Sequence, residues 1–166
     1  DPVERNNFVE QANMEMLAYT QNLCQQRRSE PRDDIMSALL QAEVDGHQLT
    51  DHELAAFFSF LSAAGNETTR NAATHGLNAF LENPREWDKL VADPEGLIAS
   101  AIDEVLRWAS PVMHLRRFVT SDTQLRGLEL RAGDHVTIWY VSANRDEEVF
   151  DDPFRFNIER SPNDYV

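Results

Sequence analysis

A glycine, an acid and two threonines interrupt the apolar middle of one long predicted helix, in the run Ala63-Ala64-Gly65-Asn66-Glu67-Thr68-Thr69-Arg70-Asn71. Glycine costs a helix about 1 kcal/mol relative to alanine and threonine loses rotamer freedom, so helix stability alone does not favour this run. Small residues at Ala64 and Gly65 let a large, flat molecule approach the backbone. The Thr68 hydroxyl could turn to a carbonyl one turn earlier and open the helix, beside an acid, Glu67, that exchanges protons with solvent. The run predicts an acid–alcohol pair beside a groove, although spacing alone favours the simpler interpretation of a tolerated kink with a solvated Glu67.

A second candidate is the pair Glu104 and Arg107, which lie three residues apart in a predicted helix and therefore share a face. An exposed pair of this kind contributes only about 0–1 kcal/mol, and such spacing occurs in many helices. The surrounding residues are apolar and leave little polar face: Ile102, Val105, Leu106 and Trp108. They favour a buried pair, which is costly to break and needs further polar partners.

Two adjacent arginines, Arg116 and Arg117, stand where a strand begins in a chain that is short of positive charge. Neighbouring strand residues point to opposite faces, so one guanidinium could meet an anion while the other is solvated. Without further context, the better interpretation is that both lie on the surface. The five histidines have no metal-ligand spacing, and Cys24 on an early helix is interpreted as a structural thiol.

The elements that position these residues are mostly helices. We expect a first helix that fades in the polar run 25–30, a short second helix capped by Asp33 or Asp34, and a turn or small hairpin at 44–47. A capping box at Thr50 and Glu53 predicts a long helix to about Leu81, whose apolar first turns indicate burial. Two further helices follow, one from the Asn83 cap to residue 90 and one from residue 93 to residue 108.

In the last third the sequence pattern changes from helical to strand-like, with short predicted strands at 117–120, 123–125, 128–130 and 135–141. The last two flank an Ala132-Gly133 turn and are expected to form a hairpin. No linker or repeat is visible, so residues 1–166 are treated as a single unit, mainly α with a small β part.

Composition excludes several classes of function. The 166 residues carry 15 Lys and Arg against 29 Asp and Glu, a net charge of −14, so nucleic acid is not an expected partner. One cysteine fits a reducing compartment, and we expect a cytoplasmic protein. The most apolar stretch, residues 54–64, is too short for a transmembrane segment.

Four motifs in this order resemble the cytochrome P450 family. The run at 64–69 resembles its oxygen-activating segment, and Glu104-x-x-Arg107 resembles its Glu-x-x-Arg pair. Arg117 falls where the family has an arginine that binds a haem propionate, and the segment 152–160 resembles the one whose last residue, Arg160, completes a triad with that pair. The resemblance covers essentially the whole chain and implies a partial cytochrome P450 fold.

For the intact parent, the resemblance implies a haem-thiolate monooxygenase that inserts one oxygen atom of O2 into an unactivated C–H bond of a lipophilic substrate. The cofactor would be haem b (iron protoporphyrin IX), with electrons from NAD(P)H through a ferredoxin and a ferredoxin reductase. The implied roles are hydrogen bonding to bound oxygen for Thr68, proton relay for Glu67, room beside the haem for Ala64 and Gly65, and propionate binding for Arg117. Glu104, Arg107 and Arg160 would have a structural role in haem incorporation.

One departure from the family pattern concerns the axial cysteine, which the resemblance places beyond Val166; Cys24 is not carried over. We therefore expect an internal fragment from the C-terminal half of a larger domain, inactive alone. Finer likenesses at 65–71, 107–112 and 142–147 point to soluble bacterial members that hydroxylate terminal methyl groups of sterol side chains and methyl-branched lipids. Val112 and Met113 would then line the substrate channel.

Two other classes of function stay open. A non-catalytic acidic helical binding module would present the apolar face of the long helix, and exposure of Phe57, Phe58 and Phe60 would favour it. An enzyme of another class would use Glu67 as a base, but no second catalytic partner is visible in the sequence.

Overall fold

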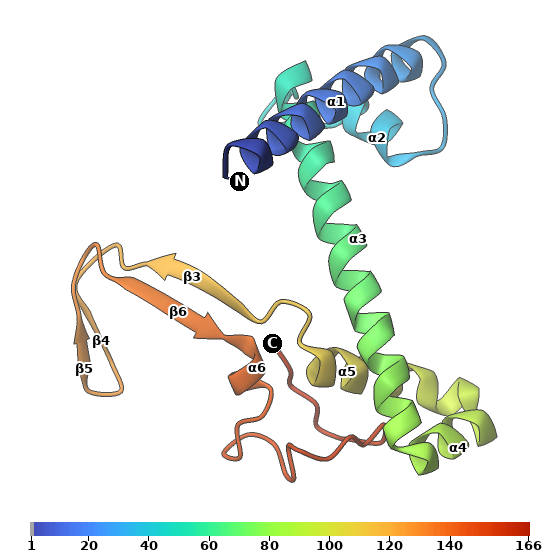
Figure 1. The fold of residues 1–166 in the computed structure, drawn as a ribbon, viewed down its shortest axis with the longest axis vertical. Helices are drawn as coiled ribbons and strands as arrows, with labels where there is room; N and C mark the ends of the chain where they lie inside the picture. Colours follow the sequence, from blue (N-terminus) through green and yellow to red (C-terminus); the bar gives the residue numbers. More distant parts are fainter. Residues whose placement is uncertain (1) are drawn as a thin grey trace. The chain divides into compact units, whose positions relative to one another are not determined.

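The computed structural model describes residues 2–166, which form a mainly helical chain with a small β part (Figure 1). Contacts group these residues into two compact units, one ending at Asn66 and one beginning at Glu67. The long helix α3 (Asp51–Glu82) supplies residues to both units. Among the described residues, no helix has both the length and the apolar character required to cross a bilayer.

The first unit contains α1 (Pro2–Ser29), α2 (Ile35–Gln41), the strands β1 (Glu43–Val44) and β2 (His47–Gln48), and the beginning of α3. Its core is built on three buried residues, Cys24, Met36 and Leu54. Helix α1 does not fade in its polar run but continues to Ser29. Basic residues in a last helical turn are favourable, and Arg27 there also donates a hydrogen bond to Asp34 (2.5 Å).

Local capping explains where most helices begin. The Asp34 carboxylate accepts from Ser37 N (2.9 Å), and the Thr50–Glu53 capping box forms in both directions. Asp93 likewise accepts a hydrogen bond from Gly96 N (3.0 Å). Asn83 occupies the N-cap position of the next helix as predicted, but its side chain makes no capping hydrogen bond. It donates instead to the Ala79 carbonyl in the preceding helix (2.8 Å).

The expectation that the first turns of α3 are buried is only partly confirmed. Leu54 and Ala55 are buried, whereas Phe57 and Phe60 are 45% and 68% exposed. Phe58 is half-buried against the core of the first unit. Within that unit the helix packs along one side, so residues on its other side meet solvent.

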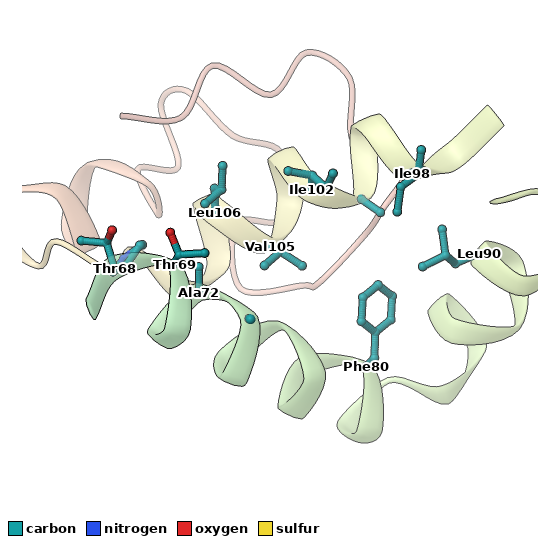
Figure 2. A pocket seen from close by; sticks show the side chains of 12 residues that line it. Thr68, Thr69, Ala72, Phe80, Leu90, Ile98, Ile102, Val105 and Leu106 are labelled. Carbon is teal, nitrogen blue, oxygen red and sulfur yellow. The ribbon is translucent and has the colours of Figure 1, made fainter. Parts of the chain in front are cut away.

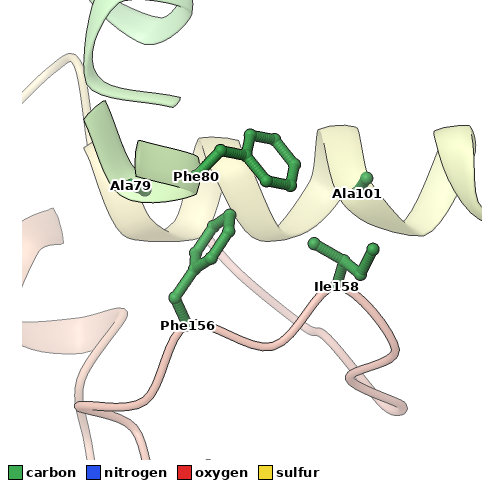
Figure 3. Packing of buried hydrophobic residues seen from close by; sticks show 5 residues of the cluster. All are labelled: Ala79, Phe80, Ala101, Phe156 and Ile158. Atoms are coloured by element: carbon green, nitrogen blue, oxygen red, sulfur yellow. The ribbon is translucent and has the colours of Figure 1, made fainter. Parts of the chain in front are cut away.

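The second unit contains the rest of α3 with α4 (Pro84–Ala92), α5 (Pro94–Ala109), the remaining strands and the short helix α6 (Tyr140–Ala143). Figure 3 shows its core of five buried residues: Ala79, Phe80, Ala101, Phe156 and Ile158. Phe156 meets Phe80 edge to face, with ring centroids 5.2 Å apart. The tail segment that carries Phe156 and Ile158 is thereby fixed against α3 and α5.

The predicted hairpin between residues 128–130 and 135–141 is wrong. Strand β4 (Thr123–Leu125) pairs with β5 (Leu128–Leu130), while β3 (His114–Phe118) pairs antiparallel with β6 (His135–Trp139). The reason is the two-residue connection Arg126-Gly127, whose φ angles of 47° and 83° suit a tight hairpin turn. The predicted last strand also ends early, because residues from Tyr140 onward form α6.

Gly76 allows the close packing of α3 on α5. A Cβ atom at this buried position would lie 2.7 Å from Val105 Cγ1. We expect Gly76→Ala to lower the free energy of unfolding by about 1–3 kcal/mol, because overpacking of a stiff β-branched neighbour outweighs the gain of about 1 kcal/mol in helix propensity. Denaturant unfolding measures the change. Gly76→Ala combined with Val105→Ala is the control and should recover part of the loss; a fully stable single variant would contradict the steric explanation.

Candidate functional site

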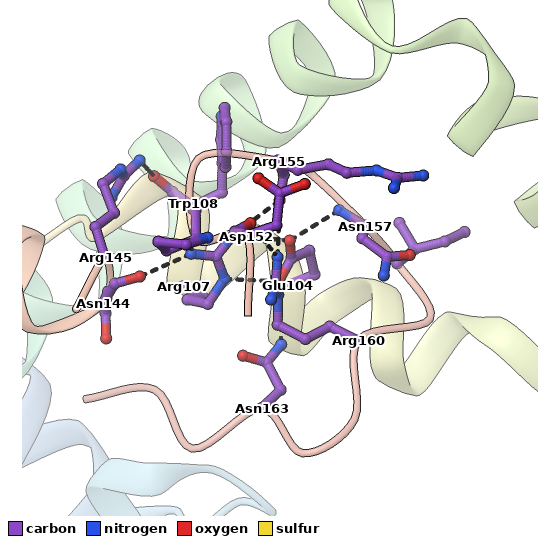
Figure 4. Close-up of polar contacts among 12 residues, drawn as sticks. Glu104, Arg107, Trp108, Asn144, Arg145, Asp152, Arg155, Asn157, Arg160 and Asn163 are labelled. Atoms are coloured by element: carbon purple, nitrogen blue, oxygen red, sulfur yellow. Dashed lines mark hydrogen bonds and ion pairs between the residues drawn. The ribbon is translucent and has the colours of Figure 1, made fainter. Parts of the chain in front are cut away.

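The second unit contains a fully buried ion pair between Glu104 and Arg107, both 0% exposed (Figure 4). Arg107 Nε and Nη2 donate to the two carboxylate oxygens at 2.8 and 2.9 Å. Its other N–H groups donate to the backbone carbonyls of Asn144 (2.7 Å), Pro153 (2.9 Å) and Arg155 (3.3 Å). The guanidinium therefore uses all five of its N–H donors, which is what a buried charge requires.

Glu104 accepts hydrogen bonds from three further residues of the tail. Arg160 Nε donates at 3.1 Å, Asn157 N at 2.8 Å and Asn163 Nδ2 at 3.2 Å. Arg160 also donates to the backbone oxygens of Asp151, Asp152 and Arg155. The structure thus brings Glu104, Arg107 and Arg160 together, and this network fixes a tail without regular secondary structure on α5.

Several members of the network were missed by sequence reasoning. Asn144 and Ser110 are buried polar residues, and the Asn144 side chain donates to Ser110 Oγ (2.9 Å). The buried Glu86 accepts from Ile158 N (3.2 Å) and from Lys89. Their partners lie in distant segments or are backbone groups, which no local pattern reveals. Asn144 lies in the run 142–147, whose resemblance to the family does not by itself indicate these contacts.

The run around Thr68 lies in an unbroken helix, so the distortion expected between Gly65 and Thr68 is not seen in the helix assignment. Thr68 lies at one end of an apolar groove of about 410 Å³ between α3, α4 and α5 (Figure 2). The groove is lined mainly by Thr68, Thr69, Ala72, Phe80, Leu90, Ile98, Ala101, Ile102, Val105 and Leu106. Thr68 and Thr69 are the only hydroxyl-bearing residues among those that line it, so the lining suits apolar rather than charged groups.

Glu67 is exposed and paired on the same helix. Arg70 Nη2 lies 2.6 and 2.7 Å from the carboxylate oxygens, and Asn71 Nδ2 lies 3.3 Å from one of them. The Arg70 guanidinium lowers the pKa of Glu67, so the group is an anion at neutral pH. It must first take a proton from solvent before it can pass one on.

Removal of the Arg70 partner should raise the pKa of Glu67. The lowered pKa means that the pair contributes to folding above the unfolded pKa of glutamate and that this contribution is lost as the pH falls through the folded value. In Arg70→Gln the carboxylate loses its cation, and an NMR titration of the Glu67 side chain should show the upward shift. Arg85→Gln, on α4, is the control that should leave the titration unchanged. An unaltered Glu67 titration in Arg70→Gln would contradict this assignment.

Arg117 lies exposed on β3 and donates to the Arg116 carbonyl (3.1 Å). Arg116 lies with its guanidinium 5.6 Å from the Phe118 ring centre. Neither arginine forms an ion pair with a carboxylate among residues 2–166. Val112 and Met113, 37% and 58% exposed, do not line the groove at Thr68. The structure therefore does not bring these two residues together with Thr68.

Comparisons with known proteins identify the family of this chain. The family model described as Cytochrome P450 matches residues 2–164. The chain belongs to the cytochrome P450 family. It is 46% identical over its full length to a methyl-branched lipid omega-hydroxylase of Mycobacterium tuberculosis, and 42% identical over 93% of its length to a steroid C26-monooxygenase of Mycolicibacterium smegmatis.

Solved structures agree with this assignment. CYP109E1 from Bacillus megaterium in complex with testosterone matches 98% of the chain with a TM-score of 0.93 at 41% identity, and 45% of that structure is covered. The Mycobacterium marinum cytochrome P450 CYP268A2 in complex with pseudoionone matches 92% of the chain with a TM-score of 0.86 at 44% identity, and 37% of it is covered. The fold is therefore a partial cytochrome P450 fold. The chain spans 39% of the length of its methyl-branched lipid omega-hydroxylase relative.

The residues present fit the haem that the family implies. An added Cβ atom at Gly65 would meet no atom within 4 Å, so the backbone of α3 is open to a planar group there. The Arg117 guanidinium is exposed and forms no ion pair with a carboxylate among residues 2–166, so it is accessible to an anion such as a propionate. Cys24 does not fit as a ligand, because its thiol is buried 3.5 Å from Met36 Sδ and burial raises its pKa. No group of three or more His, Cys, Asp or Glu residues in the described part of the chain could hold a metal ion.

Proposed function

We propose that the protein to which this chain belongs is a haem-thiolate monooxygenase that hydroxylates an unactivated C–H bond of a lipophilic substrate. The observation that carries the proposal is the 46% identity, over the whole of this chain and 39% of the relative, to a methyl-branched lipid omega-hydroxylase. The chain alone supplies no axial thiolate, so we expect it to be inactive by itself. We also propose a cytoplasmic location, on the evidence of its single cysteine.

When bound, haem b with an axial thiolate activates O2, so that one oxygen atom enters the substrate as a hydroxyl and the other leaves as water, with two electrons from NAD(P)H and two protons. Ferredoxin and ferredoxin reductase would deliver the electrons. In this chain, Arg117 would hold a propionate through a charge-assisted hydrogen bond. Ala64 and Gly65 would keep α3 clear of the ring. Glu104, Arg107 and Arg160 hold the tail on α5.

Proton delivery is the task of Glu67 and Thr68. The Thr68 hydroxyl would donate a hydrogen bond toward bound oxygen. Glu67 would take a proton from solvent at its exposed carboxylate and pass it toward that hydroxyl, which leaves Glu67 as the anion that Arg70 stabilises.

The proposed substrate is a sterol side chain or a branched or fatty lipid, attacked at a terminal methyl group. The relatives named for a methyl-branched lipid and for steroid C26 support this class. Val112 and Met113 would contact the substrate with exposed apolar side chains. Their apolar character gives affinity for hydrocarbon without specifying one lipid.

The test uses the complete translation product of the gene, purified with haem and supplied with a ferredoxin and its reductase. Incubation under isotopically labelled oxygen with a methyl-branched fatty acid, and separately with a steroid that bears an alkyl side chain, should yield one labelled oxygen atom in a terminal hydroxyl. Failure to bind haem would overturn the family function. Binding of haem without any labelled product from either lipid would overturn the substrate class.

The exposure of Phe57 and Phe60 favours a second candidate, a non-catalytic acidic helical binding module. The same preparation separates the two candidates, because a binding module would lack both haem and oxygen consumption.

A further inference from the structure

Asn144 is fully buried at the end of α6, and each of its polar atoms has a partner. Its backbone N–H donates to Tyr140 O (2.8 Å), and its carbonyl accepts from Arg107 Nη1 (2.7 Å). Its side-chain Nδ2 donates to Ser110 Oγ (2.9 Å) and to the backbone oxygen of Val166 (3.0 Å), while Oδ1 accepts from Val166 N (2.9 Å). One carboxamide thus joins α5, α6 and the tail.

The backbone at Val166 is held by this carboxamide through two hydrogen bonds. The two hydrogen bonds close a ring in which the side chain of Asn144 replaces the neighbouring strand of an antiparallel pair. Such a ring fixes direction as well as position, because both the donor and the acceptor of one residue are engaged.

The rest of this short segment is also held by polar contacts with α5. Asn163 Nδ2 donates to Glu104 (3.2 Å), and the Tyr165 hydroxyl donates to Asp103 (3.4 Å). Asn163 Oδ1 is buried without a hydrogen-bond partner among residues 2–166, so it can accept from one more N–H group. Hydrogen bonds therefore fix the direction of residues 163–166, and Asn163 Oδ1 can accept one further hydrogen bond.

We propose that Asn144 is a positioning residue, whose buried carboxamide aims the chain at Val166 and so sets the direction of the segment that carries the axial thiolate. The inference rests on the proposed function, in which that cysteine follows Val166. Asn144 touches neither haem nor substrate and acts through the backbone it holds. A partner that orients a metal ligand in this way contributes strongly to metal affinity.

The hydrogen-bonded ring with Val166 explains why residue 144 is asparagine. The ring requires a donor and an acceptor on one short, planar side-chain group. Alanine would leave both Val166 groups unpaired. Aspartate would keep the acceptor for Val166 N but lose the donors to Ser110 Oγ and Val166 O. Glutamine adds a methylene group where no side-chain atom is exposed.

The experiment compares Asn144→Ala with Asn83→Ala in the complete haem-loaded protein. Asn83 is the matched control, because its carboxamide donates only to the Ala79 carbonyl on α3. For Asn144→Ala we expect haem transfer to apomyoglobin to accelerate by about tenfold or more, with loss of the thiolate band in the ferrous carbonyl spectrum. Asn83→Ala should keep both properties of the unmodified protein. Equal behaviour of the two variants would overturn the proposal.

Hydrogen exchange on the unmodified protein keeps the proposal testable if Asn144→Ala does not fold. The Val166 amide, which donates to Asn144 Oδ1, should exchange much more slowly than the amide of the exposed residue Asp164. Unprotected exchange at Val166 would overturn the proposal. This measurement does not depend on haem, so a failure of the proposed function is recognised separately, as an unmodified protein that binds no haem.

Discussion

Replacement of Arg107 by alanine should lower the free energy of unfolding by about 3–5 kcal/mol, because it leaves the buried Glu104 charge without its main partner. Three backbone carbonyls, at Asn144, Pro153 and Arg155, would lose a donor in the same change. The tail that these bonds hold on α5 should loosen. In the complete protein we therefore expect no haem incorporation, measured as haem per polypeptide after expression with a haem precursor.

Arg126→Ala is the matched control for this experiment. Arg126 and Glu148 are 3.4 Å apart, with side chains 83% and 74% exposed, so their pair contributes little. The control should keep normal stability and haem content. Normal haem content in Arg107→Ala would rule out the role given to the buried pair. Arg107→Lys should also fail, because an ammonium cannot make the forked contact with Glu104 and reach the carbonyls at the same time.

The second large effect is expected for Thr68→Ala, which removes one of the two hydroxyl groups that line the groove. If Thr68 has the proposed role, loss of that hydroxyl should impair proton delivery to bound oxygen, and more of the reduced oxygen should leave as peroxide. The complete protein should consume NAD(P)H at a similar rate but convert only a minor part of the electrons into hydroxylated product. The ratio of product to NAD(P)H consumed, together with peroxide formed, measures the change.

Thr74→Ala is the control on the same helix. Its hydroxyl donates to the Arg70 carbonyl (2.8 Å), and Thr74 is not among the groove residues. Coupling should be unchanged in this variant. Full coupling in Thr68→Ala would show that the role assigned to Thr68 is wrong.

The parts of the fold that the sequence predicts are those set by neighbouring residues. The Thr50–Glu53 capping box, the Asp34 and Asp93 caps and the long helix from residue 51 depend on contacts within one turn. The burial of Glu104 and Arg107 also follows locally, because apolar residues surround them in the helix. Short-range spacing carries enough information for each of these features.

The features that were missed depend on distant partners. The pairing of β3 with β6 joins strands separated by a complete hairpin, and the strand pattern alone fits more than one partner. Asn144 meets Val166 from 22 residues away through backbone groups that every residue possesses. The burial predicted for the phenylalanines of α3 is only partly confirmed for a related reason. An apolar pattern predicts that a face can be buried but not which element covers it.

The separation in sequence between α5 and its tail has a kinetic consequence. Asn157 N and the Glu104 carboxylate that accepts its hydrogen bond are 53 residues apart, so a long loop must close before this bond can form. Helices α3, α4 and α5 contain local bonds and can form earlier. We therefore expect docking of the tail to be a late step of folding, and substitutions of its partners should accelerate unfolding while folding rates stay nearly constant. By this argument the Glu104–Arg107 network sets the lifetime of the folded chain.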